Sequence, residues 1–167
     1  MVRLLTDSSF PGWAAIIEAG GTFTWETWSP SDLIGDSMSH GWGSSALVAM
    51  QETLLGVSLA EPGTDGTVRL SVAPPSGGLT RASGSVPTIA GAVEVSWERR
   101  GAGPGLHLDL DVPANAVAVV RLPATGASSV REGGAAAGSA PGVHVTSVGG
   151  GVAVLSVGSG SYRFTSA

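Results

Sequence analysis

The sequence predicts an α+β fold in which a short N-terminal helical segment precedes an antiparallel β-sandwich or jelly-roll-like domain. Hydrophobic residues recur at a helical spacing before residue 60, and after residue 67 they alternate with polar residues as in half-buried strands. The alternating runs are short and bounded by glycine or proline, which is typical of sandwiches. We therefore place one domain at residues 1–62 and a second at residues 63–167.

Two helices are predicted in the first domain. One covers residues 13–20 and ends at a glycine pair, because glycine readily adopts the left-handed conformation of a C-terminal cap. The other covers residues 47–54 and ends at Gly56. Residues 22–40 follow no helical period and are rich in Ser, Thr, Gly and Asp, so we expect a loop. The apolar faces of the two helices consist of Trp13, Ile16, Ile17, Leu47, Met50 and Leu54.

Strands are predicted wherever the hydrophobic period is two. The last two runs should form a hairpin across Gly158–Gly160 that closes the sheet. Residues 133–142 contain only Gly, Ala, Ser and Pro, and we expect this low-complexity segment to be a flexible loop. The alternating runs lie at residues 68–72, 93–97, 106–110, 117–119, 152–157 and 162–164.

Composition argues against several classes of function. The net charge of -5 and the absence of lysine disfavour a nucleic-acid surface. Without cysteine there is no thiol nucleophile, and no His/Asp cluster has metal-ligand spacing, so we expect neither metal nor cofactor. The N-terminus lacks the apolar region of a signal peptide, and no apolar run approaches the ~18 residues of a membrane span. We expect a soluble protein without membrane partners, with a cytoplasmic location favoured.

Four of the five tryptophans fall within the first 42 residues, in a stretch that also holds the plausible acid and base groups. Glu26 lies between Trp25 and Trp28, and His40 lies close before Trp42. Indole rings can cover the apolar CH face of a sugar, while a carboxylate and an imidazole bond its hydroxyls and move protons. The cluster therefore predicts a pocket for a neutral, hydroxyl-rich ring.

Six segments carry a resemblance to a known family: Gly21–Trp28, Ser37–Gly43, Leu55–Gly63, Gly84–Trp97, Val112–Asn115 and Val157–Phe164. In this order, over nearly the whole chain, they resemble the C-terminal end of bacterial α-L-rhamnosidases. In that family an (α/α)6 barrel carries the active site and a C-terminal β-sandwich packs against it. The resemblance implies that residues 1–62 are the last helices of an incomplete barrel and that the sandwich follows.

The resemblance also implies the chemistry of an inverting glycosidase, which uses two carboxylic acids separated by about 6.5 to 9.5 Å. The Trp-Glu motif makes Glu26 the candidate general base, while the family's general acid lies upstream in the barrel. His40, Trp25, Trp28 and Trp42 are candidate contacts to a rhamnose-containing glycoside or oligosaccharide. Since the chain lacks the opposed acid, we expect it to be inactive alone.

Each candidate also has an ordinary structural interpretation. For Glu26 this is a surface or helix-cap carboxylate, and for His40 it is a hydrogen-bonded structural histidine. The tryptophans of the loop are either pocket or packed core. Trp13, which is in register with the apolar face of the first helix, is assigned to the core.

The function predicted from the sequence is that of a C-terminal fragment of an α-L-rhamnosidase-like hydrolase. It would supply the general-base loop and a sandwich cap, and its protein partner would be the remainder of the catalytic barrel. One alternative is a free-standing β-sandwich module that binds carbohydrate or protein, although few aromatic residues follow residue 98. Another is a rhamnosyl-uronate lyase on the same scaffold, in which Glu26 and His40 would remove a proton from a uronate ring.

Overall fold

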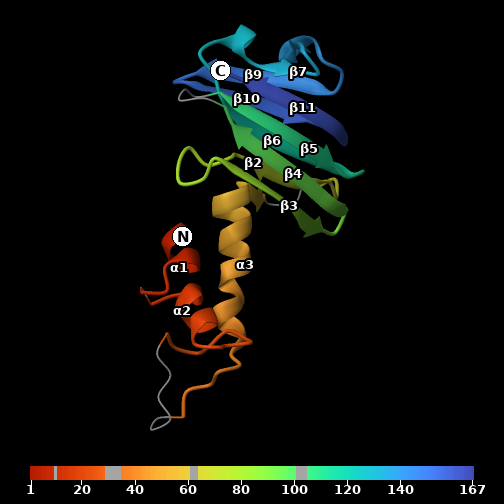
Figure 1. The fold of residues 1–167 in the computed structure, drawn as a ribbon. Coiled ribbons are helices and arrows are strands. Elements are labelled where there is room, and N and C mark those ends of the chain that lie inside the picture. The colour runs from red at the N-terminus through yellow and green to blue at the C-terminus, as the bar shows by residue number, and fades with distance from the viewer. Residues whose placement is uncertain (10, 29–34, 61–63, 101–104) are drawn as a thin grey trace. The chain divides into compact units, whose positions relative to one another are not determined.

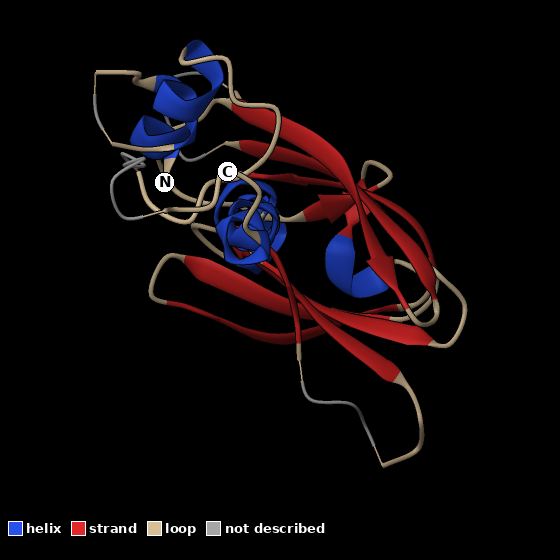
Figure 2. Ribbon diagram, turned by 90° about the horizontal axis from the view of Figure 1, so that it is seen from below, coloured by secondary structure: helices blue, strands red, loops and turns tan. Residues whose placement is uncertain are grey.

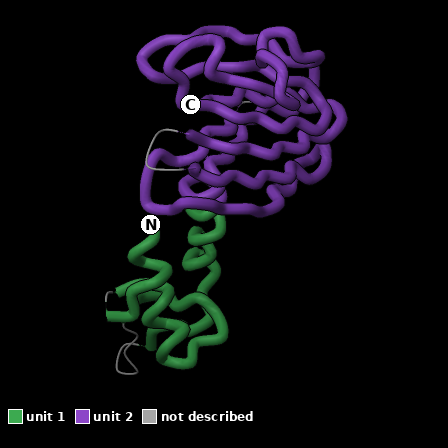
Figure 3. Tube along the Cα trace, turned by 45° about the horizontal axis from the view of Figure 1, so that its top comes forward, with its two compact units in different colours: residues 1–50 green, residues 51–167 purple. Residues whose placement is uncertain are grey.

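The chain folds into two compact units, residues 1–50 (unit 1) and residues 51–167 (unit 2), as Figure 3 shows. Unit 1 contains short helices and a long loop, and unit 2 is a β-structure (Figure 1). This confirms the α+β class with helices preceding a sandwich. The assignment of residues 1–62 to a barrel and of residues 63–167 to the sandwich domain stays a prediction. The computed structural model describes residues 1–9, 11–28, 35–60, 64–100 and 105–167.

The helices of unit 1 include the first predicted one, the first part of the second, and one that was not predicted. The first predicted helix is α2, which ends as expected: Gly20 has φ +83° and the Gly21 N–H donates to the Ile16 carbonyl at 2.9 Å. The extra helix, α1, has only five residues, too few to show a hydrophobic period. The elements are α1 (Val2–Thr6), α2 (Trp13–Glu18), a 3-10 turn η1 (Gly41–Ser44) and α3 (Ser45–Met50).

Unit 2 begins with a π-helical turn, η2 (Gln51–Leu55), which directly follows α3 in the chain. Together these two elements form the second predicted helix. Gly56 ends it with φ +77°, and a side chain there would also collide with the Ala73 carbonyl. Only glycine fits both conditions, because other residues rarely adopt a positive φ. The sequence prediction of this boundary is confirmed.

Two sheets stack face to face in unit 2 (Figure 2). Sheet A has the strand order β1-β2-β6-β10-β9, and sheet B has the order β3-β4-β5-β11-β7-β8. All neighbouring strands are antiparallel except β2 and β6, which run parallel. The strands are β1 (Val57–Leu59), β2 (Val68–Val72), β3 (Arg81–Thr88), β4 (Gly91–Arg99), β5 (Leu106–Val112), β6 (Ala116–Pro123), β7 (Arg131–Glu132), β8 (Ala135–Ala136), β9 (Val143–Gly149), β10 (Val152–Val157) and β11 (Gly160–Ser166).

The core of unit 2 lies between the sheets and is made by the alternation seen in the sequence. In β5, for example, the apolar residues are buried while His107, Asp109 and Asp111 occupy the alternate positions. Trp97 is fully buried, and its indole N–H donates to the Leu54 carbonyl at 3.2 Å, which ties η2 to the core. The largest fully buried side chains are Trp97, Phe164, Leu70, Leu108, Leu110, Leu122 and Leu155.

The predicted C-terminal hairpin is wrong. β10 pairs with β6 and β9 in sheet A, whereas β11 pairs with β5 and β7 in sheet B. The chain therefore crosses from one sheet to the other between Val157 and Gly160, which has φ +145°. The physical reason is that both strands bury one face, and facing sheets bury Leu155 and Phe164 in a single core.

The prediction of a flexible loop over residues 133–142 is also wrong. The segment contains part of a small hairpin, β7–β8, whose turn is Gly133-Gly134 with positive φ at both residues. A 3-10 turn, η4 (Ala137–Ser139), follows, and Ala137 and Ala140 are buried in the core. Their methyl groups are small enough to fit into the core of unit 2. The small residues of this segment therefore allow it to pack closely.

Strands β1, β3 and β9 were not predicted, because β1 has only three residues and the other two are largely exposed. In β3 only Val86 is buried, and in β9 only Val143 is buried. Among the described residues, no helix is long and apolar enough to cross a membrane.

Candidate functional site

The candidate site lies in unit 1, where two stretches of the loop run side by side. The Glu26 N–H donates to the Ser37 carbonyl at 2.8 Å, and the His40 N–H donates to the Thr24 carbonyl at 2.8 Å. The Thr24 hydroxyl returns a bond to the His40 carbonyl at 2.6 Å. These bonds satisfy backbone groups that no helix or sheet pairs, so they define the shape of the loop.

Gly43 allows the turn η1 to approach Thr24 closely. A Cβ atom at this position would lie 2.5 Å from the Thr24 Cβ, well inside van der Waals contact. The Gly43 carbonyl also accepts the Trp13 indole N–H at 2.9 Å. Glycine is therefore required here by space, and the close approach brings the α2 tryptophan to the loop.

The Glu26 carboxylate has two polar neighbours. One of its oxygens, Oε2, accepts the Ser37 N–H at 2.9 Å and lies 3.7 Å from His40 Nδ1. The latter distance is too long for a direct hydrogen bond, so the His40 ring lies beside the carboxylate without bonding it. Both side chains remain 33% exposed, which leaves the carboxylate accessible to a water or ligand.

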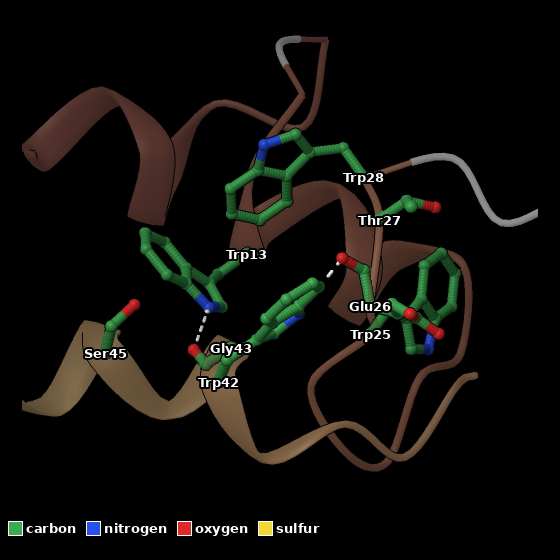
Figure 4. Close-up of a pocket in the computed structure, with 8 residues that line it drawn as sticks. All are labelled: Trp13, Trp25, Glu26, Thr27, Trp28, Trp42, Gly43 and Ser45. Atoms are coloured by element: carbon green, nitrogen blue, oxygen red, sulfur yellow. Dashed lines mark hydrogen bonds between the residues drawn. The ribbon is translucent and has the colours of Figure 1, made fainter. Parts of the chain in front are cut away.

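A cavity of about 410 Å³ includes Glu26 in its lining (Figure 4). Its walls are mainly indole rings, and Glu26 is the only ionisable group among the described residues that line it. The lining residues are Trp13, Trp25, Glu26, Thr27, Trp28, Trp42, Gly43 and Ser45.

The indoles are held by specific contacts. Trp13 and Trp28 meet edge to face, with ring centroids 5.0 Å apart at 87°. The Trp42 indole N–H donates to the Glu26 carbonyl at 3.1 Å, drawn as a dashed line in Figure 4, and its ring lies 4.3 Å from the His40 ring. Aromatic walls beside one acceptor carboxylate suit a ring with apolar CH faces and hydroxyl groups.

The structure brings the five predicted site residues together. Glu26, Trp25, Trp28 and Trp42 line the cavity, while His40 contacts Glu26 and Trp42 without lining it. Trp13 lines the cavity as well, so its assignment to the core alone is wrong. Helical register with Ile16 suggested burial, and only the fold shows that the indole reaches Gly43, thirty residues away in the chain.

No second carboxylate lines this cavity within the described part of the chain. No group of three or more His, Cys, Asp or Glu that could hold a metal ion occurs there. A single carboxylate can accept a proton from water or bond hydroxyls. It cannot also protonate a departing group on the opposite side of a substrate.

Comparison with known sequences identifies relatives over almost the whole chain. The family model of the bacterial alpha-L-rhamnosidase C-terminal domain matches residues 56–137. An alpha-L-rhamnosidase of Streptomyces avermitilis is 31% identical over 98% of this chain, and one of Formosa agariphila is 29% identical over 78%. The chain spans only 15% and 14% of the lengths of these two relatives.

Solved structures give the same picture. The Streptomyces avermitilis alpha-L-rhamnosidase complexed with L-rhamnose matches 99% of this chain with a TM-score of 0.73 and 28% identity. The alpha-L-rhamnosidase from Dictyoglumus thermophilum matches 99% with a TM-score of 0.77 and 26% identity. The Aspergillus terreus enzyme matches 97% with a TM-score of 0.66 and 25% identity. The chain covers 16 to 18% of these structures.

Proposed function

Since this chain carries the C-terminal domain of the bacterial α-L-rhamnosidase family, we propose that it supplies the general-base loop and the sandwich cap of an inverting rhamnoside hydrolase. The observation that carries the proposal is Glu26, which lines an indole-rich cavity and has a partly exposed carboxylate with one oxygen held by the Ser37 N–H. A base held in one position and still accessible is what water activation needs.

In the proposed reaction, a water molecule between Glu26 and the sugar attacks the anomeric carbon and gives its proton to the Glu26 carboxylate. The bond from that carbon to the leaving oxygen breaks, and a carboxylic acid on the other side protonates this oxygen. That acid comes from the part of the enzyme that this chain does not contain. The chain alone is therefore expected to be inactive, because acid assistance typically contributes ~10²- to 10⁴-fold.

The proposed substrate is a rhamnose-containing glycoside or oligosaccharide. L-Rhamnose is a 6-deoxy sugar, so it combines hydroxyl groups with a methyl group. The indole walls of the cavity suit its apolar parts, while Glu26 and the neighbouring His40 provide polar contacts.

An apolar face of unit 1 supports the proposal that a larger catalytic domain completes the enzyme. Ile17 and Leu47 are 70% and 65% exposed, and Phe23 and Val48 are also exposed. A groove of about 380 Å³ includes Ile17, Phe23 and Leu47 in its lining. Such faces seldom remain open to water in a stable monomer. We propose that helices of the remaining barrel cover it, with residues 1–62 as the end of that barrel.

A free-standing carbohydrate-binding sandwich is less well supported. Surface platforms for sugars are usually aromatic. The two aromatic residues after residue 100, Tyr162 and Phe164, are both buried in the core of unit 2. The exposed indoles among the described residues, Trp28 and Trp42, lie in unit 1 instead.

A chimeric enzyme tests the proposal. This chain replaces the matching segment of the Streptomyces avermitilis α-L-rhamnosidase, to which it is 31% identical. Hydrolysis of an aryl α-L-rhamnoside is then measured for the chimera, its Glu26→Gln variant and the chain alone. We expect turnover by the chimera only, with kcat of Glu26→Gln reduced at least ~10²-fold and KM little changed, because an amide cannot take the proton. Near-normal turnover by Glu26→Gln would show that the base lies elsewhere.

A further inference from the structure

We propose that Trp42 is a positioning residue that holds the Glu26 backbone and the His40 ring in one arrangement. This inference rests on the proposed function, since it assigns a role relative to the general base. Trp42 contacts both residues: its N–H donates to the Glu26 backbone carbonyl at 3.1 Å, and its ring centroid lies 4.3 Å from that of His40, with the ring planes at 44°.

Burial does not account for the position of this indole. Trp42 remains 64% exposed, so little of its ring is removed from water. Its placement in unit 1 instead follows from the hydrogen bond, the ring contact with His40 and its position in η1. Trp28, by comparison, lines the same cavity but packs edge to face against Trp13.

The hydrogen bond from Trp42 restrains Glu26, whose position decides whether it can act as the general base. Glu26 is held at three points: its N–H bonds the Ser37 carbonyl, its carboxylate accepts the Ser37 N–H, and its carbonyl accepts the Trp42 N–H. The first two contacts come from one residue and could move together as the loop shifts. The Trp42 bond ties Glu26 to η1, a separate element, and so limits that movement.

The direct test uses the full chain. Trp42→Phe keeps a ring beside His40 but removes the N–H donor. Amide hydrogen exchange is measured by NMR at Ser37, whose N–H reports the position of the Glu26 carboxylate, and at Glu26. We expect exchange of both amides to become about 3- to 10-fold faster, which is the effect of losing one ordinary hydrogen bond. Trp28→Phe is the matched control and should leave both rates unchanged.

Kinetics in the chimera separate positioning from sugar contact. Trp42→Phe should lower kcat about tenfold with KM within about twofold, because a misplaced base slows chemistry without weakening ground-state binding. Trp42→Ala should lower kcat further, whereas Trp28→Phe should mainly raise KM. If Glu26→Gln abolishes turnover and Trp42→Phe does not change kcat or exchange, this inference alone is wrong. If Glu26→Gln retains turnover, the proposed function fails, while the exchange result still decides whether Trp42 holds the loop.

Discussion

Gly43→Ala should open the site loop while leaving unit 2 intact. The added Cβ would lie 2.5 Å from the Thr24 Cβ and 2.9 Å from its Oγ1, whereas carbon atoms normally pack at about 3.5 to 4.0 Å. Thr24 must therefore move by roughly 1 Å, and both of its bonds to His40 lengthen. Overpacking costs about 1 to 3 kcal/mol, and each weakened hydrogen bond adds about 0.5 to 1.5 kcal/mol.

The loop should thus lose about 2 to 6 kcal/mol of local stability. Hydrogen exchange of the His40 amide, which bonds the Thr24 carbonyl, measures this loss directly. Gly41→Ala is the matched control, because a Cβ there meets no atom within 4 Å in the same 3-10 turn. The reasoning is refuted if the His40 amide exchanges equally slowly in both variants, or if Gly43→Ala unfolds the sandwich.

Two further predictions concern alkaline stability and association. Burial, followed by the Glu132 charge, raises the pKa of Tyr162 above its usual value of 10.0, so the folded state favours the neutral phenol. Stability from this group is complete below about pH 10 and declines as the pH rises further, because only the unfolded chain ionises readily. Urea unfolding of Tyr162→Phe, which removes the sole tyrosine, should show a smaller decline over this range; an identical decline would contradict the assignment. The exposed apolar face of unit 1 should make the chain alone self-associate in sedimentation. Replacing Ile17 and Leu47 by serine should reduce this association with less than ~0.5 kcal/mol change in unfolding free energy, and unchanged association would locate the contact elsewhere.

The sequence by itself determined those elements whose signals are local. The helix at α2 and its glycine cap, the helical end at Gly56, and strands β2 and β10 follow from spacing within about ten residues. A helix or strand that buries one face must repeat apolar residues at its own period, so the pattern is readable without the fold. The chemical character of the site was also readable, because the tryptophans, Glu26 and His40 are close in the chain.

Only the tertiary structure decided which elements meet. The parallel pairing of β2 with β6 and the passage from β10 to β11 across two sheets depend on partners far apart in the sequence. The burial of Ala137 has the same origin, since a methyl group is core only where the surrounding packing leaves space for it.

The geometry of the site was likewise decided only by the tertiary structure. The sequence placed Glu26 and His40 in one loop, but a loop without a period has no intrinsic conformation to predict. The contacts that shape it are the Ser37 N–H on the Glu26 carboxylate, the Trp13 N–H on Gly43 and the Trp42 N–H on Glu26. Each joins residues between 11 and 30 positions apart, so it forms only when the chain has already folded back on itself.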